Sequence, residues 1–283
     1  MSTFGFYSIV LVDRITPATT DADRDYVRSN CGIVDGWPVV TEPFIQWVIE
    51  DSFCNGRPPL ETLSAAPYNV LLTEHVEAYE CMKMRLLNAS HTGMCYLGYL
   101  MGYRYIHEIM LDTNIEIYIR HLMNNEVTPT LPPVPGIDLE NYKQTLVERF
   151  SNPHIKDTAL RVCMDGASKF PKFLVPTIVE QLKLGNCPRF CALAVGAWIR
   201  YLSCVDEQNQ PMTLQDSLAV ELKLMEMALD TKPSARKILS VTQVFGNLAE
   251  NEKFSEAVER VVHLLYEHGS KEALQRWVNE III

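Results

Sequence analysis

The sequence lacks the motifs that mark many nucleotide-binding and catalytic sites. It contains no G-x-G-x-x-G dinucleotide fingerprint, no G-x-x-x-x-G-K-[ST] phosphate loop and no G-x-S-x-G nucleophile elbow. It has no H-E-x-x-H pair either, and the histidines between His75 and His121 are spaced too widely to ligate a metal from one helix. These absences disfavour a serine hydrolase and a zinc-dependent alcohol dehydrogenase, and they leave the chain no visible means of binding a dinucleotide by itself.

Long apolar runs, charge runs and cysteine pairs are missing as well. No signal peptide and no apolar run of about 18 residues is present, so we expect a cytoplasmic protein that does not contact the membrane. No block of five like charges occurs, and the net charge of −10 argues against nucleic acid as a partner. None of the eight cysteines forms a C-x-x-C pair, which predicts reduced and mostly buried thiols and no metal site.

The remaining composition predicts a folded, mainly α protein. The chain has 283 residues, of which 47% are hydrophobic, enough for one large domain or two small ones. Two stretches near the N-terminus predict strands: Phe4–Val12, and Pro38–Ile49 with its β-like runs Val39–Thr41 and Phe44–Ile49. Asn69–Thr73 is another short apolar run. From Glu74 onward the apolar residues recur with the helical period. The fold expected is therefore a multi-helix domain with a few short N-terminal strands.

Start and stop signals divide the helical part. We expect a helix from Glu74 to about Ser90, a separate buried helix over Cys95–Leu111, and N-caps at Asp112 and Asp157. The proline-rich stretch 129–136 cannot be helical. Thr213 with Asp216 resembles a capping box that opens a helix to about Leu229. The other expected helices are one holding Leu139 to Phe150, Lys172–Leu184, Pro188–Ser203, Ser234–Leu248, Lys253–His268 and Lys271–Glu280.

Four polar side chains gather on one side of the first expected helix. At about 100° per residue, Glu80, Lys83, Asn88 and His91 share an arc of about 140°. Groups of this kind are costly to bury without partners, so the cluster is either a solvated face or a site. Lys83 could act as a general base, provided that its pKa falls from about 10.4 towards neutrality. Asn88 could donate to a developing alkoxide, His91 could bind a substrate hydroxyl, and Glu80 could relay the proton of Lys83.

Ordinary structural roles explain each of these side chains too. Lys83 can be a solvated helix lysine, Asn88 a packing amide and His91 a satisfied core histidine. Glu80 and Lys83 can form a simple surface pair three residues apart.

A second cluster surrounds the Gly-containing turn Asp165–Pro171. Lys169 lies in this turn, and Arg161 precedes it by about one helical turn. Two cations beside such a turn could bind a polyhydroxylated or anionic ligand. They could equally complement the dipole at a helix C-terminus.

Taken together, several ordered segments resemble the polyol-specific long-chain dehydrogenases, the mannitol dehydrogenase family. The family's K-x-x-x-x-N-x-x-H motif fits Lys83, Asn88 and His91 without a gap. The matching runs, in the family's order, are Asp13–Pro17, Glu42–Phe44, Gln46–Val48, Glu50–Asp51, Gly56–Pro58, Lys83–His91, Arg149–Pro153 and Asp165–Pro171.

The resemblance implies a metal-free, NAD(P)-dependent interconversion of a polyol and a ketose, such as mannitol and fructose. It implies that Lys83 is the general base, that Asn88 stabilises the alkoxide and that His91 contacts the substrate. It gives Glu80 the role of gating the proton of Lys83. Positions that look like the family's substrate-binding ones are Asp13, Arg161 and Lys169.

The resemblance also implies a domain organisation. It predicts that residues 1–20 are the remnant of a link from an N-terminal Rossmann domain, and that residues 21–283 form the substrate domain, similar to the C-terminal domains of 6-phosphogluconate-type dehydrogenases. NAD or NADP would then be bound mainly by a domain absent from the chain or supplied by another chain. Two alternatives stay open: a hexuronate reductase that clamps the substrate carboxylate with Arg161 and Lys169, and a non-catalytic remnant that only binds.

Overall fold

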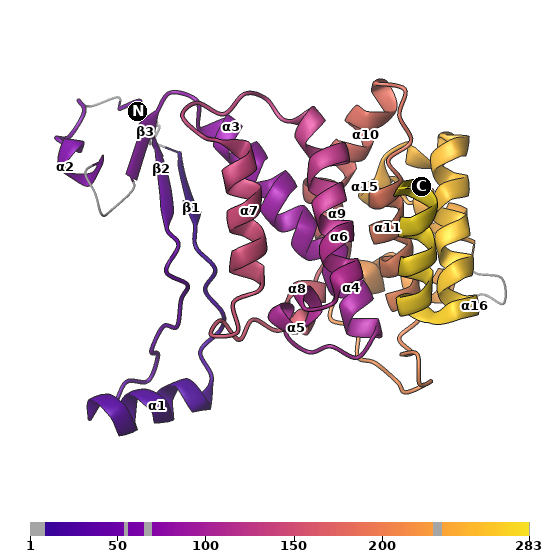
Figure 1. The fold of residues 1–283 in the computed structure, drawn as a ribbon, viewed down its shortest axis with the longest axis horizontal. Helices are drawn as coiled ribbons and strands as arrows, with labels where there is room; N and C mark the ends of the chain where they lie inside the picture. Colours follow the sequence, from indigo (N-terminus) through magenta and orange to yellow (C-terminus); the bar gives the residue numbers. More distant parts are fainter. Residues whose placement is uncertain (1–8, 54–55, 65–69, 229–233, 283) are drawn as a thin grey trace, which may run out of the picture.

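A three-stranded sheet covers one end of the helical body in the computed structural model, which describes all residues except 1–8, 54–55, 65–69, 229–233 and 283 (Figure 1). The strands are β1 (Val10–Asp13), β2 (Gln46–Glu50) and β3 (Val70–Thr73), in the order β1-β2-β3. β2 runs antiparallel to β1 and parallel to β3.

The predicted strand over Pro38–Ile49 is wrong for most of its length, because only its last four residues pair as part of β2. Residues 4–8 of the first expected strand lie outside the described residues.

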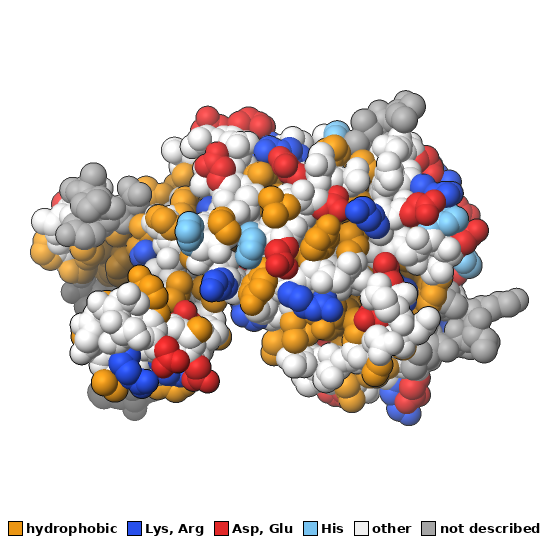
Figure 2. All heavy atoms as spheres, turned by 60° about the horizontal axis from the view of Figure 1, so that its bottom comes forward, with side chains coloured by type: hydrophobic (Ala, Val, Ile, Leu, Met, Phe, Trp, Pro, Cys, Tyr) orange, Lys and Arg blue, Asp and Glu red, His pale blue; other side chains and the backbone are white. Residues whose placement is uncertain are grey.

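Helix α1 (Asp21–Cys31) stands away from the body at the end of a long arm between β1 and β2 (Figures 1 and 2). Thr20 caps it, since its hydroxyl accepts a hydrogen bond from the backbone of Asp23. None of its residues is buried. A short helix, α2 (Glu61–Ser64), precedes β3.

One continuous helical run leads from the sheet into the body. It consists of α3 (Val76–Met82), the π-helix η1 (Lys83–Asn88) and α4 (Ala89–Leu100). The helix end expected between Ser90 and Cys95 is therefore wrong. Gly93 lies where α4 crosses α6, and a Cβ on it would approach Tyr118 Oη to 2.9 Å, so this glycine serves packing and does not end the helix.

The run ends later, near Gly102, which has a φ of +97°. The single helix expected over Cys95–Leu111 is therefore divided. Its second part is α5 (Ile106–Met110), separated from α4 by a short turn.

The rest of the chain forms the body around α11 (Arg189–Tyr201), whose residues from Phe190 onward are all buried. Helix α16 (Glu252–Ile282) packs along it, and a Cβ on Gly196 of α11 would collide with Val261 of α16. The other elements are α6 (Thr113–His121), the π-helix η2 (Leu122–Val127), the 3-10 helix η3 (Thr128–Thr130), α7 (Leu139–Phe150), α8 (Ala159–Cys163), α9 (Gly166–Phe173), α10 (Val175–Lys183), α12 (Ser217–Glu221), α13 (Leu224–Ala228), α14 (Ala235–Leu239), α15 (Thr242–Phe245) and the 3-10 helix η4 (Leu248–Glu250).

One of the three expected helix caps is confirmed and two are wrong. Asp112 caps α6, as predicted, by accepting a hydrogen bond from the backbone of Asn114 at 3.0 Å. Asp157 does not cap α8, because its carboxylate is taken by a side-chain ion pair, and the neighbouring Thr158 caps the helix instead. The capping box at Thr213 is also wrong, since Asp216 itself is the N-cap of α12.

Two more of the expected helices are divided. The helix from Thr213 to about Leu229 becomes α12 and α13, with Lys223 between them at a φ of +54°. The segment Ser234–Leu248 also divides, into α14 and α15, although Ser240 and Val241 between them have negative φ. Gly269, at a φ of +75°, kinks α16 between the two helices expected over Lys253–His268 and Lys271–Glu280, and that division is confirmed. The mainly α fold with short N-terminal strands is nevertheless confirmed. Within the described residues, no helix is both long and apolar enough to cross a membrane.

Candidate functional site

Six of the seven side chains singled out in the sequence line one cavity of about 300 Å³. It lies where the end of β1 meets η1, α4, α8 and α9. The six residues are Asp13, Lys83, Asn88, His91, Arg161 and Lys169. The seventh, Glu80, is exposed on α3 and is not among the residues that line the cavity.

The π-helix η1 aligns two of these residues. The backbone N–H of Ala89 donates to the carbonyl of Met84, five residues back. In a π-helix residues five apart differ less in direction than they do in an α-helix, so Lys83 and Asn88 are closer to one line than α-helical geometry predicts. π-Helical turns are rare and occur often at functional sites. No local signal in the sequence indicated this turn.

Lys83 is half-buried, and its Nζ donates a hydrogen bond to the carbonyl oxygen of Val12 at the end of β1. Asn88 and His91 each carry a buried polar atom without a partner among the described residues, Oδ1 and Nε2 respectively. Leaving a buried polar atom unpaired costs about 1–3 kcal/mol. A ligand with several hydroxyl groups would supply the missing partners.

His91 is a neutral imidazole at physiological pH. Its side chain lies against the ring of Phe150, with the two centroids 4.4 Å apart. Burial lowers the pKa of His91 to about 4, and the nearby guanidinium groups of Arg161 and Arg149 act in the same direction. A neutral ring has one donor and one acceptor nitrogen, which suits hydrogen bonding to a hydroxyl group.

Two of the cations that line the cavity are hydrogen-bonded to the surrounding protein. Arg161 forms a bidentate pair with Asp157, at 2.6 and 2.5 Å. Lys169 Nζ donates to the carbonyl of Val162 at 2.9 Å. Burial, together with the charge of Arg161, lowers the pKa of Lys169.

Asp13 is almost fully buried, and both of its carboxylate oxygens are already bonded. Arg149 donates to both oxygens, and the hydroxyl of Tyr142 donates to Oδ2 at 2.9 Å. The same guanidinium binds Glu42. No sequence pattern indicates this cluster, because Arg149 lies 136 residues from Asp13 and 107 from Glu42.

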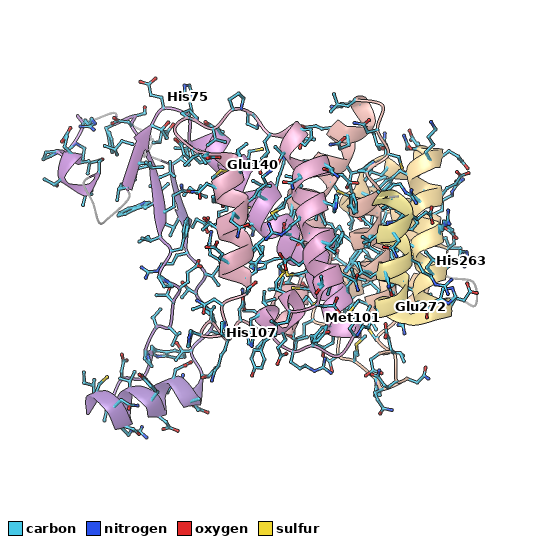
Figure 3. The ribbon with its side chains drawn as sticks, in the orientation of Figure 1. His75, Met101, His107, Glu140, His263 and Glu272 are labelled. Atoms are coloured by element: carbon cyan, nitrogen blue, oxygen red, sulfur yellow. The ribbon has the colours of Figure 1, made fainter. Side chains whose placement is uncertain are left out.

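A larger cavity of about 920 Å³ lies between α3, the proline-rich loop and α10. It contains none of the predicted site residues. Figure 3 shows three histidines far apart: His75, just before α3, at the top of the view, His107, on α5, at the bottom, and His263, on α16, at the right. Across the described residues no group of three or more His, Cys, Asp or Glu side chains could hold a metal ion.

The fold and the cavity define a mainly α domain with a polar pocket. The mannitol dehydrogenase C-terminal domain model matches residues 75–266, and the mannitol dehydrogenase Rossmann domain model matches residues 2–62. The chain belongs to the mannitol dehydrogenase family. The Rossmann-domain match extends beyond the predicted link of residues 1–20, and the division at residue 20 stays a prediction.

Individual relatives agree with this assignment. Mannitol dehydrogenase DSF1 of Saccharomyces cerevisiae is 41% identical over 273 residues, which cover 96% of this chain and 53% of the relative. Mannitol 2-dehydrogenase of Phaeosphaeria nodorum is 40% identical, with 96% and 47% covered. The chain thus spans about half the length of the curated relatives it matches.

Solved structures show the same partial coverage. The Pseudomonas fluorescens mannitol 2-dehydrogenase, in a ternary complex with NAD and D-mannitol, matches with a TM-score of 0.88 and 44% identity, covering 96% of this chain and 54% of that one. A D-sorbitol dehydrogenase in substrate-free form matches with a TM-score of 0.83 and 27% identity, covering 94% and 54%.

Proposed function

We propose that the chain forms the substrate half of an NAD(P)-dependent polyol dehydrogenase that interconverts D-mannitol and fructose. The observation that carries the proposal is the meeting of Asp13, Lys83, Asn88, His91, Arg161 and Lys169 in one cavity. Its volume of about 300 Å³ is at the lower end of the range of roughly 300–1,000 Å³ for small-molecule pockets, which suits a six-carbon polyol. The named activity of the relatives, and the D-mannitol bound by one of them, support this substrate.

The proposed chemistry divides among three side chains. Oxidation of an alcohol requires the hydroxyl to lose a proton while its carbon gives up a hydride. In its neutral form, Lys83 accepts the proton, and a positioned general base contributes about 10²–10⁴-fold to the rate. Asn88 stabilises the developing alkoxide through its amide. His91, neutral because it is buried, bonds a neighbouring hydroxyl without adding charge.

The other predicted residues bind the substrate or relay the proton. Arg161 and Lys169 hold the distal hydroxyl groups, and Asp13 forms part of the wall beside them. Glu80 is exposed one turn before Lys83, so we propose that it receives the proton of Lys83 through water and passes it to solvent. No metal takes part in this scheme.

We propose that the nucleotide is held outside this cavity, because about 300 Å³ is too small for a dinucleotide as well as a substrate. When bound, NAD(P) supplies the hydride acceptor. We propose that a Rossmann domain covers the arm and the outer face of β1. Among the described residues, nine of the fourteen exposed large hydrophobic side chains fall between Ile9 and Val40, within the Rossmann-domain match. Exposed apolar patches of this kind mark interaction surfaces.

One observation favours a second candidate, a hexuronate reductase. Four cations line the cavity, namely Arg14, Lys83, Arg161 and Lys169, against the single carboxylate of Asp13, which is already paired. An excess of positive charge would favour a substrate with a carboxylate, such as fructuronate.

The test is reconstitution. The chain is fused to the Rossmann domain of the Pseudomonas fluorescens relative, and reduction of NAD is followed with D-mannitol, D-arabinitol and D-sorbitol. The reverse reaction is compared on fructose and fructuronate. The proposal expects the highest turnover on mannitol and fructose. A preference for fructuronate would favour the second candidate. Folded protein that gains no turnover from the added Rossmann domain would favour the non-catalytic remnant that only binds.

A further inference from the structure

A buried guanidinium joins three segments that are distant in sequence. Arg149, on α7, donates from Nη2 to Asp13 Oδ1 at 2.6 Å and from Nη1 to Oδ2 at 3.1 Å. It also donates from Nε to Glu42 Oε2 at 2.9 Å and from Nη2 to Oε1 at 2.8 Å. The ring of Phe44 lies 4.0 Å from the guanidinium carbon. Both carboxylates are only 1% exposed, so these ion pairs are shielded from solvent.

The segment after β1 is fixed on its other side as well. Glu42 accepts a hydrogen bond from the backbone N–H of Ile15, and its own N–H donates to the carbonyl of Ile15 at 3.2 Å. Arg14 Nε donates to the carbonyl of Glu42 at 3.0 Å. Arg149 therefore holds the whole end of the strand in place against α7.

The end of this strand carries the group that orients Lys83. The carbonyl of Val12, the residue directly before Asp13, accepts the hydrogen bond from Lys83 Nζ. The residue after Arg149, Phe150, contacts the ring of His91. One turn of α7 thus fixes the surroundings of two proposed site residues.

We infer that Arg149 is a positioning residue of the pocket: its ion pairs hold the end of β1 so that the Val12 carbonyl orients the Lys83 amine. The inference rests on the proposed function, since it assigns the lysine a task in that reaction. Arg149 is not itself among the residues lining the cavity, so it acts through Asp13 and Val12.

The test compares three variants of the chain. Arg149→Lys keeps the charge but loses the bidentate geometry. Tyr142→Phe removes only the hydroxyl that donates to Asp13. Arg85→Lys is the matched control, because Arg85 lies in the same π-helix as Lys83 and forms a bidentate pair of its own with Glu180, at 2.7 and 2.9 Å.

Circular dichroism first shows that each variant is folded. Acetic anhydride is then added at a limiting amount, and mass spectrometry measures the acetylation of Lys83 relative to the exposed Lys253. We expect a several-fold rise in Lys83 labelling in Arg149→Lys, a smaller rise in Tyr142→Phe, and the wild-type value in Arg85→Lys. In the reconstituted enzyme, Arg149→Lys should lower kcat for mannitol more than it raises KM.

Wild-type labelling of Lys83 in folded Arg149→Lys and Tyr142→Phe would overturn the inference, and so would an equal rise in Arg85→Lys. If Arg149→Lys does not fold, the labelling of Lys83 in Tyr142→Phe alone tests the inference. The labelling needs neither nucleotide nor turnover, so it can be read even if the proposed reaction is wrong. Absence of turnover in all proteins would count against the proposed function alone.

Discussion

Adding one methyl group at Gly166 should disturb both the stability and the pocket. Gly166 is the first residue of α9, three residues before Lys169. A Cβ at this position would lie 2.5 Å from Tyr96 Oη and closer still to Trp198 Nε1, whereas real Cβ contacts essentially never fall below 3.0 Å. Both aromatic side chains are fully buried and cannot swing into solvent. The Gly166→Ala substitution must therefore push α9 away from α4 and α11.

Overpacking of this kind costs about 1–3 kcal/mol. At about 2–4 °C per kcal/mol for a chain of this size, the melting temperature should fall by about 2–12 °C. The movement of α9 should also displace Lys169 and weaken the binding of D-mannitol.

The assay is thermal melting by circular dichroism, together with calorimetric titration of D-mannitol. Gly36→Ala is the matched control, because a Cβ there meets no atom within 4 Å and the backbone is not left-handed. That change should alter the free energy of unfolding by no more than about 0.5 kcal/mol. Equal melting temperatures of Gly166→Ala and Gly36→Ala would show that α9 accommodates the methyl group without cost.

Two further predictions concern buried ionisable groups. Burial lowers the pKa of His91 to about 4, so between pH 6.5 and 4 the unfolded state binds more protons than the folded state. Lowering the pH from 7 to 5 should therefore reduce the free energy of unfolding by roughly 2 kcal/mol through this residue. Urea unfolding at both pH values should show a smaller loss in His91→Phe, and equal losses would contradict the assignment. Glu126 accepts hydrogen bonds from the backbone N–H groups of Phe190 and Cys191, both at 2.7 Å, at the start of α11. Glu126→Gln turns an amide N–H towards one of these N–H groups, so the free energy of unfolding in urea at pH 8 should fall by about 1–3 kcal/mol. Wild-type stability would refute the role of Glu126 as an acceptor for these two N–H groups.

The sequence was informative wherever a pattern repeated locally. The helical period after Glu74 predicted the mainly α body, and the spacing of Lys83, Asn88 and His91 predicted that these residues share a face. The structure places all three in one cavity. Their roles in catalysis stay predictions.

Features that depend on distant contacts could not be read from the sequence. The π-helical turn at Lys83 depends on a shift of backbone hydrogen bonds, which has no composition signal. The break expected between Ser90 and Cys95 is absent, and Gly93 in this stretch packs closely against Tyr118 within α4. The ion pairs of Arg149 join residues more than 100 positions apart. Asp157 was predicted as a helix cap because its ion pair with Arg161 could not be read from the sequence.

The most direct test of the central claim is the turnover of Lys83→Ala in the reconstituted enzyme. Lys183→Ala, which removes an exposed lysine at the other cavity, serves as the control. We predict that kcat for D-mannitol oxidation falls by about 10²–10⁴-fold in Lys83→Ala and stays at the wild-type value in Lys183→Ala. An unchanged kcat in Lys83→Ala would contradict the assignment of this lysine as the general base.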